Sequence, residues 1–137
     1  LKPIIVSKDI GKLIDELPIL FIIAALTKGV SRFNNVGDLK HKESNRLLES
    51  KKILVQAGIK CETTKDSIII YGKDKIDTQN KSILTKTKGD HRICMASAIL
   101  SLATGIRSKI KNFETVNTSF PEFISLIKHL GGKIVIK

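Results

Sequence analysis

Charged residues crowd into one short stretch of the sequence, KHKESNRLLE, residues 40–49. Lys42, Glu43 and Arg46 lie where a loop meets an expected helix that Ser44 can cap. The free N–H groups of a helix start attract anions, and a planar guanidinium suits a carboxylate or a phosphate. Glu43 could act as a general acid if burial or a bound anion held its proton. Ion pairing along a solvated helix start is the alternative, with equal weight on spacing alone.

A second group of reactive residue types is GDHRICMA, residues 89–96. Asp90 can cap a helix there, and His91 and Arg92 follow in its first turn. The helix dipole disfavours a cation at this end, so Arg92 indicates that something negative binds beside it. The alternatives are that Arg92 simply pairs with Asp90, and that a single histidine at a helix start is structural.

The segment IDELPI, residues 14–19, also has the pattern of a helix start. Asp15 can cap the helix, and Pro18 lies where a first helical turn tolerates proline. Glu16 competes with Asp15 for any functional role. On this pattern alone, a capping role for Asp15 is favoured.

NTSFPEF, residues 117–123, predicts another helix that starts near Pro121 and is capped by Thr118 or Ser119. Taken alone, it indicates a helix start and nothing more. The sequence has no Walker-type loop, no GxGxxG and no Cys/His set with zinc spacing, so no metal site is readable from it.

The composition is that of a basic globular domain. Of 137 residues, 42% are hydrophobic, and 24 Lys and Arg against 13 Asp and Glu give a net charge of +11. A positive net charge fits a protein that binds nucleic acid, an anionic membrane surface or a phosphorylated metabolite. It also fits a surface that is only solvated. The longest apolar stretch, Ile19–Leu26, is too short to span a bilayer. Without CxxC spacing, Cys61 and Cys94 are expected to be reduced thiols in a cytoplasmic protein.

Hydrophobic periodicity and glycine stops predict alternating strands and helices. The helices within 19–28 and 93–104 are apolar on nearly all sides and should be buried, whereas the helix 44–58 is amphipathic. Expected strands are 3–7, 30–36, 59–64, 67–72, 82–87, 106–113 and 133–137, and expected helices are 19–28, 44–58, 93–104 and 120–132.

The order of these elements repeats. Fourteen residues separate Asp15 from Gly29, and fourteen separate His91 from Gly105. An interval of roughly 75 residues is too long for a solenoid and suits a duplicated βαβαββ unit. We therefore expect an α/β (α+β) fold in which buried helices pack under mixed sheets. Residues 1–137 would form a single partial domain, with units of about 1–75 and 76–137, cut from a longer protein.

Three motifs resemble one family. KESNR is similar to the KESDR motif of the enolpyruvyl transferase family of 3-phosphoshikimate 1-carboxyvinyltransferase (EPSP synthase). GDHRICMA resembles its DHRMAM-type motif, and NTSFPEF resembles its final SFP/TFP-type segment. The spacing agrees as well, including the 28 residues from Asp15 to Glu43. The resemblance covers essentially the whole chain and corresponds to roughly the last third of the enzyme.

The resemblance implies a reaction. The family transfers the enolpyruvyl group of phosphoenolpyruvate (PEP) to the 5-hydroxyl of shikimate 3-phosphate and releases phosphate, in the chorismate pathway of aromatic amino acid biosynthesis. The reaction passes through a tetrahedral intermediate and uses neither metal nor organic cofactor. Two domains of βαβαββ units close over the substrates. The missing N-terminal domain is then the expected partner of this chain, in a monomer that binds neither nucleic acid nor membrane.

The resemblance also assigns roles by position. Asp15 matches the aspartate that binds shikimate 3-phosphate and accepts a proton, and Glu43 matches the donor that protonates the PEP methylene carbon. Lys42 matches a lysine that contacts shikimate 3-phosphate. Arg46 and Arg92 match arginines that hold PEP. The residue types suit this chemistry, because the hydroxyl needs a base, the enol carbon an acid, and the phosphate fixed cations.

Three positions depart from the family pattern. The usual Asp of KESDR is Asn45 here, and Asp38 stands where some members have an asparagine that contacts substrate. Thr118 stands where many members have a PEP-binding lysine, so it is left out of the site. Lys111 or Lys86 could supply that charge.

Two other functions remain open. A sister enzyme transfers enolpyruvyl to UDP-N-acetylglucosamine, but it would lack the KES–R and DHR pairing. A basic RNA-binding module could share the βαβαββ unit, although this chain has few aromatic residues among its basic ones. Under the resemblance to EPSP synthase, a chain that lacks the N-terminal part of the site should be inactive alone.

Overall fold

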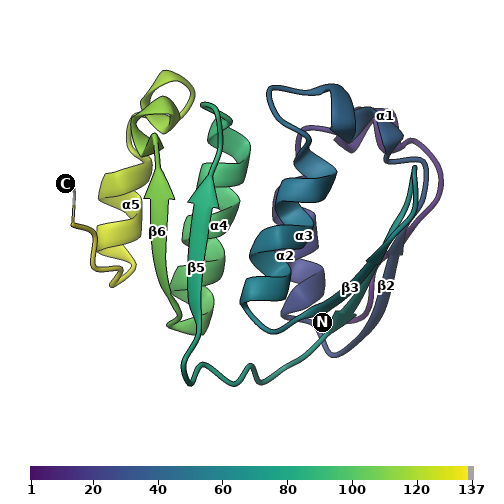
Figure 1. Ribbon diagram of the computed structural model, residues 1–137, viewed down its shortest axis with the longest axis horizontal. Helices are drawn as coiled ribbons and strands as arrows, with labels where there is room; N and C mark the ends of the chain where they lie inside the picture. Colours follow the sequence, from purple (N-terminus) through teal and green to yellow (C-terminus); the bar gives the residue numbers. More distant parts are fainter. Residues whose placement is uncertain (136–137) are drawn as a thin grey trace.

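The structure is a computed structural model and describes residues 1–135 of the chain. Strands and helices alternate along it, and short 3-10 helices (η) occupy two of the connections (Figure 1). The elements are β1 Ile5–Val6, α1 Ile10–Leu13, α2 Leu17–Ala25, β2 Gly29–Phe33, η1 Gly37–His41, α3 Arg46–Gln56, β3 Lys60–Thr63, β4 Ile68–Gly72, β5 Ser82–Lys86, α4 His91–Thr104, β6 Arg107–Lys111, η2 Phe113–Thr118 and α5 Phe123–His129.

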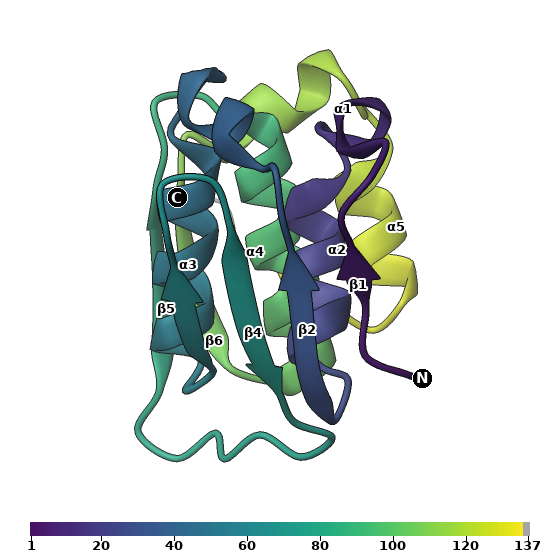
Figure 2. The same ribbon diagram turned by 90° about the vertical axis from the view of Figure 1, so that its right-hand side faces the viewer.

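The first half of the chain builds a mixed sheet in the order β1-β2-β4-β3. β1 runs parallel to β2, while β4 is antiparallel to both β2 and β3. The helices α2 and α3 lie behind this sheet in Figure 2. Parallel strands need a crossover connection, and here the segment that contains α2 supplies the one between β1 and β2.

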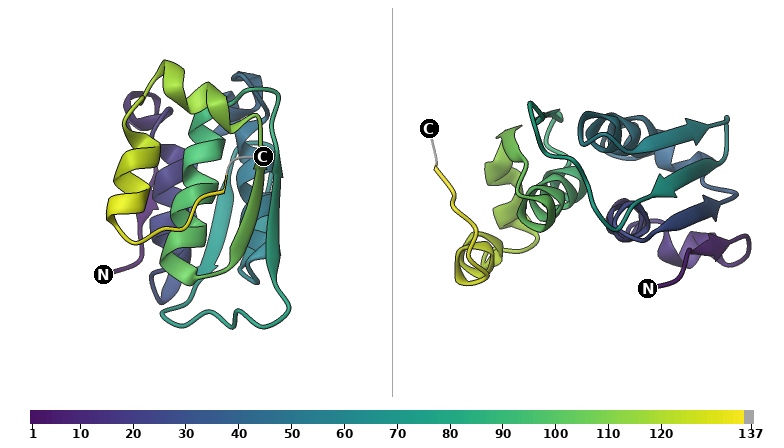
Figure 3. Two further views of the ribbon diagram at one scale, coloured as in Figure 1. Left: turned by 90° about the vertical axis from the view of Figure 1, so that its left-hand side faces the viewer. Right: turned by 90° about the horizontal axis from the view of Figure 1, so that it is seen from below.

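The second half adds a separate pair of parallel strands, β5 and β6, connected through α4. α4 contacts both of these strands and also packs against α2 and α3. Viewed from below, α2 and α3 therefore lie between the four-stranded sheet and α4 (Figure 3). Each of the helices α2, α3 and α4 begins at the upper end of the molecule in Figure 1.

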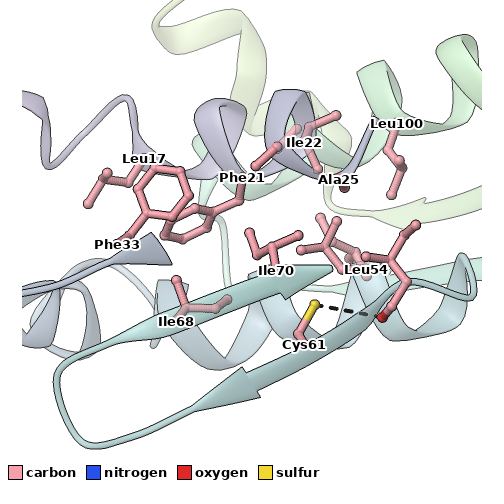
Figure 4. Packing of buried hydrophobic residues seen from close by; sticks show 14 of the residues in the cluster. Leu17, Phe21, Ile22, Ala25, Phe33, Leu54, Cys61, Ile68, Ile70 and Leu100 are labelled. Carbon is pink, nitrogen blue, oxygen red and sulfur yellow. Dashed lines mark hydrogen bonds between the residues drawn. The ribbon is translucent and has the colours of Figure 1, made fainter. Parts of the chain in front are cut away.

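The core is continuous across the two halves. Phe21 of α2 meets Phe33 of β2 edge to face, with ring centroids 4.9 Å apart. Ile70 of β4, Leu54 of α3 and Leu100 of α4 belong to the same buried cluster (Figure 4). Because α2 is apolar on all sides, it can be buried between sheet and helices, as its sequence predicts.

A side chain from the first half covers one edge of the second sheet. Gln56 at the end of α3 accepts a hydrogen bond from the backbone N of Leu84 in β5, at 2.7 Å. Its Nε2 donates to the carbonyl oxygen of the same residue at 3.3 Å. The side-chain amide of Gln56 thus satisfies the backbone N–H and C=O groups of β5 that would otherwise be free to pair with another strand.

The mixed α/β fold is confirmed, with differences in detail. We expected buried helices under mixed sheets, whereas α4 packs on a separate two-stranded sheet that is purely parallel. The short α1 and the two 3-10 helices lie in segments expected to be loops. The expected last strand is wrong for residues 133–135, which form no strand, and 136–137 lie outside the described residues. The duplicated unit stays a prediction.

Candidate active site

The starts of three helices meet at one place. Asp15 lies two residues before α2, Arg46 is the first residue of α3, and Asp90 is the N-cap of α4. Their side chains are linked by hydrogen bonds, although 31 residues separate Asp15 from Arg46 and 44 separate Arg46 from Asp90. Helix starts carry a partial positive charge, so this junction favours bound anions.

Arg46 is the centre of the junction, and its side chain is only 1% exposed. Its Nε donates to Asp90 Oδ2 at 2.9 Å, and its Nη1 donates to Asp15 Oδ1 at 2.9 Å. Its Nη2 donates to Glu43 Oε2. The fixed fork of donors on one guanidinium therefore brings together three carboxylates from three segments of the chain.

Asp90 is the buried end of this network, with a side chain that is 0% exposed. Its Oδ1 accepts from the backbone N of Arg92 and Ile93, which caps α4 as the sequence predicts. Its Oδ2 also accepts from the hydroxyl of Ser44 at 2.7 Å. Burial raises the pKa of Asp90, but hydrogen bonds from Arg46 and Ser44 outweigh it, and the net pKa lies below the ordinary value.

The exposed side of the network is formed by Asp15 and Glu43, whose side chains are about half exposed. Lys42 Nζ lies 3.4 Å from Asp15 Oδ1, the same oxygen that Arg46 binds. Slight burial raises the pKa of Asp15, but hydrogen bonds from Arg46 and Lys42 outweigh it and lower the pKa overall. Asp15 is therefore an ionised, solvent-accessible carboxylate near neutral pH.

Arg92 joins the junction from α4. Its Nη1 donates to Glu16 Oε1 at 2.9 Å and to the backbone oxygen of Asp15 at 3.2 Å. This arrangement corrects the alternative in which Arg92 pairs with Asp90, because only the backbone N of Arg92 bonds that carboxylate. All five predicted residues, Asp15, Lys42, Glu43, Arg46 and Arg92, thus lie in one connected cluster.

A groove of about 300 Å³ adjoins the cluster. Asp15, Glu16 and Arg92 line its polar end. The rest of the lining is mostly apolar and comes from α2, α4, α5 and the segment before α5: Pro18, Ile19, Met95, Ala96, Ile99, Phe120, Phe123 and Leu126.

Two predicted helix caps near the cluster are wrong. Asp15 does not cap α2, because its carboxylate binds Lys42 and Arg46, and Glu16 at the N-cap makes no side-chain capping bond. Ser44 does not cap α3, because its hydroxyl donates to Asp90. In both cases a long-range charged partner displaces the local backbone contact.

Asn45 takes the N-cap of α3 instead, since its side-chain oxygen accepts from the backbone N of Leu48 at 3.1 Å. Asparagine and aspartate are equally good at this position. The departure from the family's KESDR motif therefore preserves the helix start. Asp38, the second departure, is an exposed residue of η1.

The predicted cap of the last helix is also wrong. The hydroxyls of Thr118 and Ser119 donate back to the carbonyl oxygens of Thr115 and Val116, within or next to η2. The helix α5 consequently begins later, at Phe123, with no side-chain cap.

The two lysines considered as substitutes at the Thr118 position are neighbours. Lys86 and Lys111 are register partners in the parallel pair β5–β6, at the ends of the two strands. Both are exposed. Neither makes an ion pair with the cluster within residues 1–135.

The sequence did not predict three contacts of the cluster, one of which is the buried pair of Arg46 with Asp90. The sequence pattern predicts only a cap for Ser44, although its hydroxyl links the KESNR and GDHR motifs through Asp90. Glu16 was a competitor for a role, and the structure places its carboxylate on Arg92. The opposite charges in the two motifs were the available signal, but pairing across 76 residues leaves no local pattern.

Two further findings concern the described residues. Residues 1–135 contain no helix with the length and apolarity needed to cross a membrane. The same residues contain no group of three His, Cys, Asp or Glu side chains placed to hold a metal ion.

Comparison with solved structures shows which known proteins have a fold similar to that of this chain. A structure of EPSP synthase from Acinetobacter baumannii superposes with a TM-score of 0.79 at 33% identity, covering 100% of this chain and 31% of that one. A second structure of EPSP synthase from the same organism gives a TM-score of 0.78 at 35% identity. The mixed α/β arrangement is therefore that of part of an EPSP synthase.

Sequence comparison agrees. The family model described as EPSP synthase (3-phosphoshikimate 1-carboxyvinyltransferase) matches residues 1–127, so the chain belongs to this family. The 3-phosphoshikimate 1-carboxyvinyltransferase of Campylobacter concisus is 38% identical over 134 residues, covering 98% of this chain. That of Paramagnetospirillum magneticum is 35% identical over 122 residues, covering 89% of this chain. The chain spans 30% and 27% of the length of these two relatives.

Proposed function

We propose that this chain is the C-terminal part of an enzyme that transfers the enolpyruvyl group of PEP to the 5-hydroxyl of shikimate 3-phosphate and releases phosphate. The observation that supports this most directly is the contact of one buried guanidinium with both Asp15 and Glu43. A base, an acid and fixed cations are the groups that this reaction needs. Of the five proposed residues, Asp15 and Arg92 line the groove, and Arg46 links Asp15 to Glu43.

Asp15 and Glu43 would share the proton transfers. Asp15 takes the proton of the 5-hydroxyl while the hydroxyl oxygen bonds to C2 of PEP, and Glu43 gives a proton to the methylene carbon C3. The product of this addition is a tetrahedral intermediate. The Glu43 carboxylate then takes back a proton from C3 as the C2–O bond to phosphate breaks, which restores the enol double bond, and the proton held by Asp15 leaves with the phosphate. The lowered pKa of Asp15 supports its part, because it keeps the carboxylate ionised before the reaction.

The cations Lys42, Arg46 and Arg92 would hold the anionic groups of the two substrates. Arg46 and Arg92 are proposed for PEP, and Lys42, with Asp15, for shikimate 3-phosphate. In the structure each of these cations contacts a carboxylate of the chain, so a bound phosphate or carboxylate would replace or adjoin such contacts.

The isolated chain is proposed to be inactive. Three cations of the cluster face four carboxylates, those of Asp15, Glu16, Glu43 and Asp90, so the cluster alone has no surplus of positive charge for two phosphorylated substrates. Further cations from the remainder of the enzyme would complete the site. We propose that residues 1–137 are part of one domain of that enzyme, a cytoplasmic monomer.

The test is an assay of the full-length protein that contains this chain. PEP is supplied with shikimate 3-phosphate in one arm and with UDP-N-acetylglucosamine in the other, and phosphate release is measured together with the mass of the product. We expect turnover only with shikimate 3-phosphate. Turnover with the UDP-sugar alone, or with neither acceptor, contradicts the proposal.

A further inference from the structure

The two oxygens of Asp90 bind different parts of the molecule. Oδ1 accepts from the backbone N of Arg92 at 3.1 Å and of Ile93 at 3.4 Å, at the start of α4. Oδ2 accepts from Nε of Arg46 at 2.9 Å and from the hydroxyl of Ser44 at 2.7 Å, both in or just before α3. One carboxylate with no solvent exposure therefore connects the starts of two helices.

The bond to Nε decides where the other nitrogens of Arg46 point. Nε lies at the inner end of the planar guanidinium, and binding it fixes the plane and rotation of the group. The terminal nitrogens Nη1 and Nη2 then face Asp15 and Glu43 at the exposed side of the cluster. Without Oδ2, the guanidinium would keep only its contacts to two half-exposed carboxylates.

We infer that Asp90 is a positioning residue for PEP binding: it orients the guanidinium of Arg46 through Oδ2, with Ser44 as a second donor, and begins the helix that carries Arg92 through Oδ1. This inference rests on the function proposed above. Both arginines proposed for PEP thus depend on one carboxylate that does not itself reach the substrate.

Two substitutions test these roles of Asp90, and Asp90→Ser separates orientation of Arg46 from capping of α4. In Asp90→Asn only one oxygen remains, so the side chain can cap α4 or accept from Arg46, but not both, because its amide nitrogen is a donor. In Asp90→Ser the hydroxyl still caps the helix, since serine is a good N-cap, but the oxygen for Arg46 is lost. A residue that served only as a cap would tolerate Asp90→Ser.

The experiment measures KM for PEP and for shikimate 3-phosphate separately in the full-length protein. We expect Asp90→Asn and Asp90→Ser each to raise KM for PEP about 10- to 100-fold, the size expected for a lost hydrogen bond between charged groups, with a smaller rise in KM for shikimate 3-phosphate. Gly105→Ala is the control, because it strains the far end of the same helix, where no contact with the cluster is made. Both KM values should be unchanged in it.

Ser44→Ala covers the case in which the Asp90 variants do not fold. It removes one hydrogen bond to Oδ2 and should raise KM for PEP selectively, by about two- to tenfold. Equal rises in the two KM values, or no rise, in the folded variants would overturn the positioning role. Wild-type protein that releases no phosphate from either substrate pair would instead overturn the proposed function, and this inference with it.

Discussion

Arg46 and Asp90 form an ion pair that is almost completely removed from solvent. Removing two charges from water is costly, and here the cost is offset by further hydrogen bonds from Ser44 and to Asp15 and Glu43. Burial lowers the pKa of Arg46, but Asp90 and the other carboxylates raise it by more, so the guanidinium stays charged. At the scale of single residues, the site and the stability of the fold therefore depend on the same pair.

Arg46→Met tests this dependence. The substitution leaves the buried carboxylate of Asp90 without its cation, and the free energy of unfolding should fall by about 3–5 kcal/mol. Adding Asp90→Asn should restore part of the loss, because the unpaired charge is gone. Urea denaturation measures both, and Lys52→Met, which breaks an exposed pair with Glu49, should cost less than about 1 kcal/mol. A loss no larger than that of the control would contradict the prediction.

Glu43→Gln tests the proposed proton donor. The amide keeps the size of the side chain and can still contact Arg46, but it cannot give up a proton to carbon. We expect kcat of the full-length enzyme to fall by about 10²- to 10⁴-fold with little change in stability. Glu49→Gln, in the helix α3 that follows Glu43, changes a carboxylate that pairs with Lys52; it is the matched control and should keep its kcat. A Glu43→Gln enzyme with normal kcat would remove Glu43 from the mechanism.

Residue types and motifs predicted five members of the cluster, but not how they are connected. Asp15 and Ser44 have the residue types of good N-caps, so a local pattern favours that role. Their actual partners are 31 and 46 residues away, and such distances carry no periodic signal. The resemblance to a family could locate the residues, while only the folded chain defines which oxygen meets which nitrogen.

At the scale of elements, glycine stops predicted the ends of α3 and α4, but not that of α2, which ends at Ala25, four residues before Gly29. Gly105 ends α4 in the left-handed conformation, with φ of 76°. The expected boundaries differ where tertiary contacts intervene, as at α5, which starts after the turn η2 rather than at Phe120. The apolar helices were predictable because burial on all sides leaves a continuous hydrophobic run. The division of the strands into two sheets was not, because it depends on pairing distant in sequence.

Two glycines offer a matched test of backbone conformation. A Cβ at either Gly11 or Gly105 would meet no atom within 4 Å, so neither site has a steric obstacle. Gly105 has a left-handed φ, whereas Gly11 lies in the helix α1. Alanine at Gly105 should cost about 1 kcal/mol of unfolding free energy, while alanine at Gly11 should be neutral or stabilising by up to about 1 kcal/mol. Thermal or urea unfolding of both variants checks this, and equal effects would contradict it.

At the scale of the whole molecule, the chain holds part of the proposed active site. We expect residues 1–137 alone to release no phosphate from PEP and shikimate 3-phosphate, because the cluster has more carboxylates than cations. The assay uses the same concentration of the full-length protein as the positive control. Measurable product from the isolated chain would show that the site is complete without the rest of the enzyme.

Stability should depend on pH through the buried network. The folded-state pKa values of Asp15 and Asp90 lie below the ordinary value of 3.8, so their stabilising effect is fully present above that pH. It is lost as the pH falls through the lower folded-state values. The urea concentration at which half of the wild-type protein is unfolded should therefore decrease when the pH falls below about 4. The double variant Arg46→Met, Asp90→Asn should lose less stability over the same pH interval. Parallel curves for the two proteins would contradict this.

The connection between β4 and β5, residues 73–81, is mostly exposed, contains three lysines and joins the two halves of the chain (Figure 1). The bonds from Gln56 to Leu84, Arg46 to Asp90 and Arg92 to Glu16 all cross between the halves independently of it. A trypsin cut within this segment should therefore leave a nicked complex whose two fragments migrate together on a sizing column. Because these noncovalent bonds connect the two halves, the halves could be produced as separate polypeptides that reassemble the junction of the three helix starts.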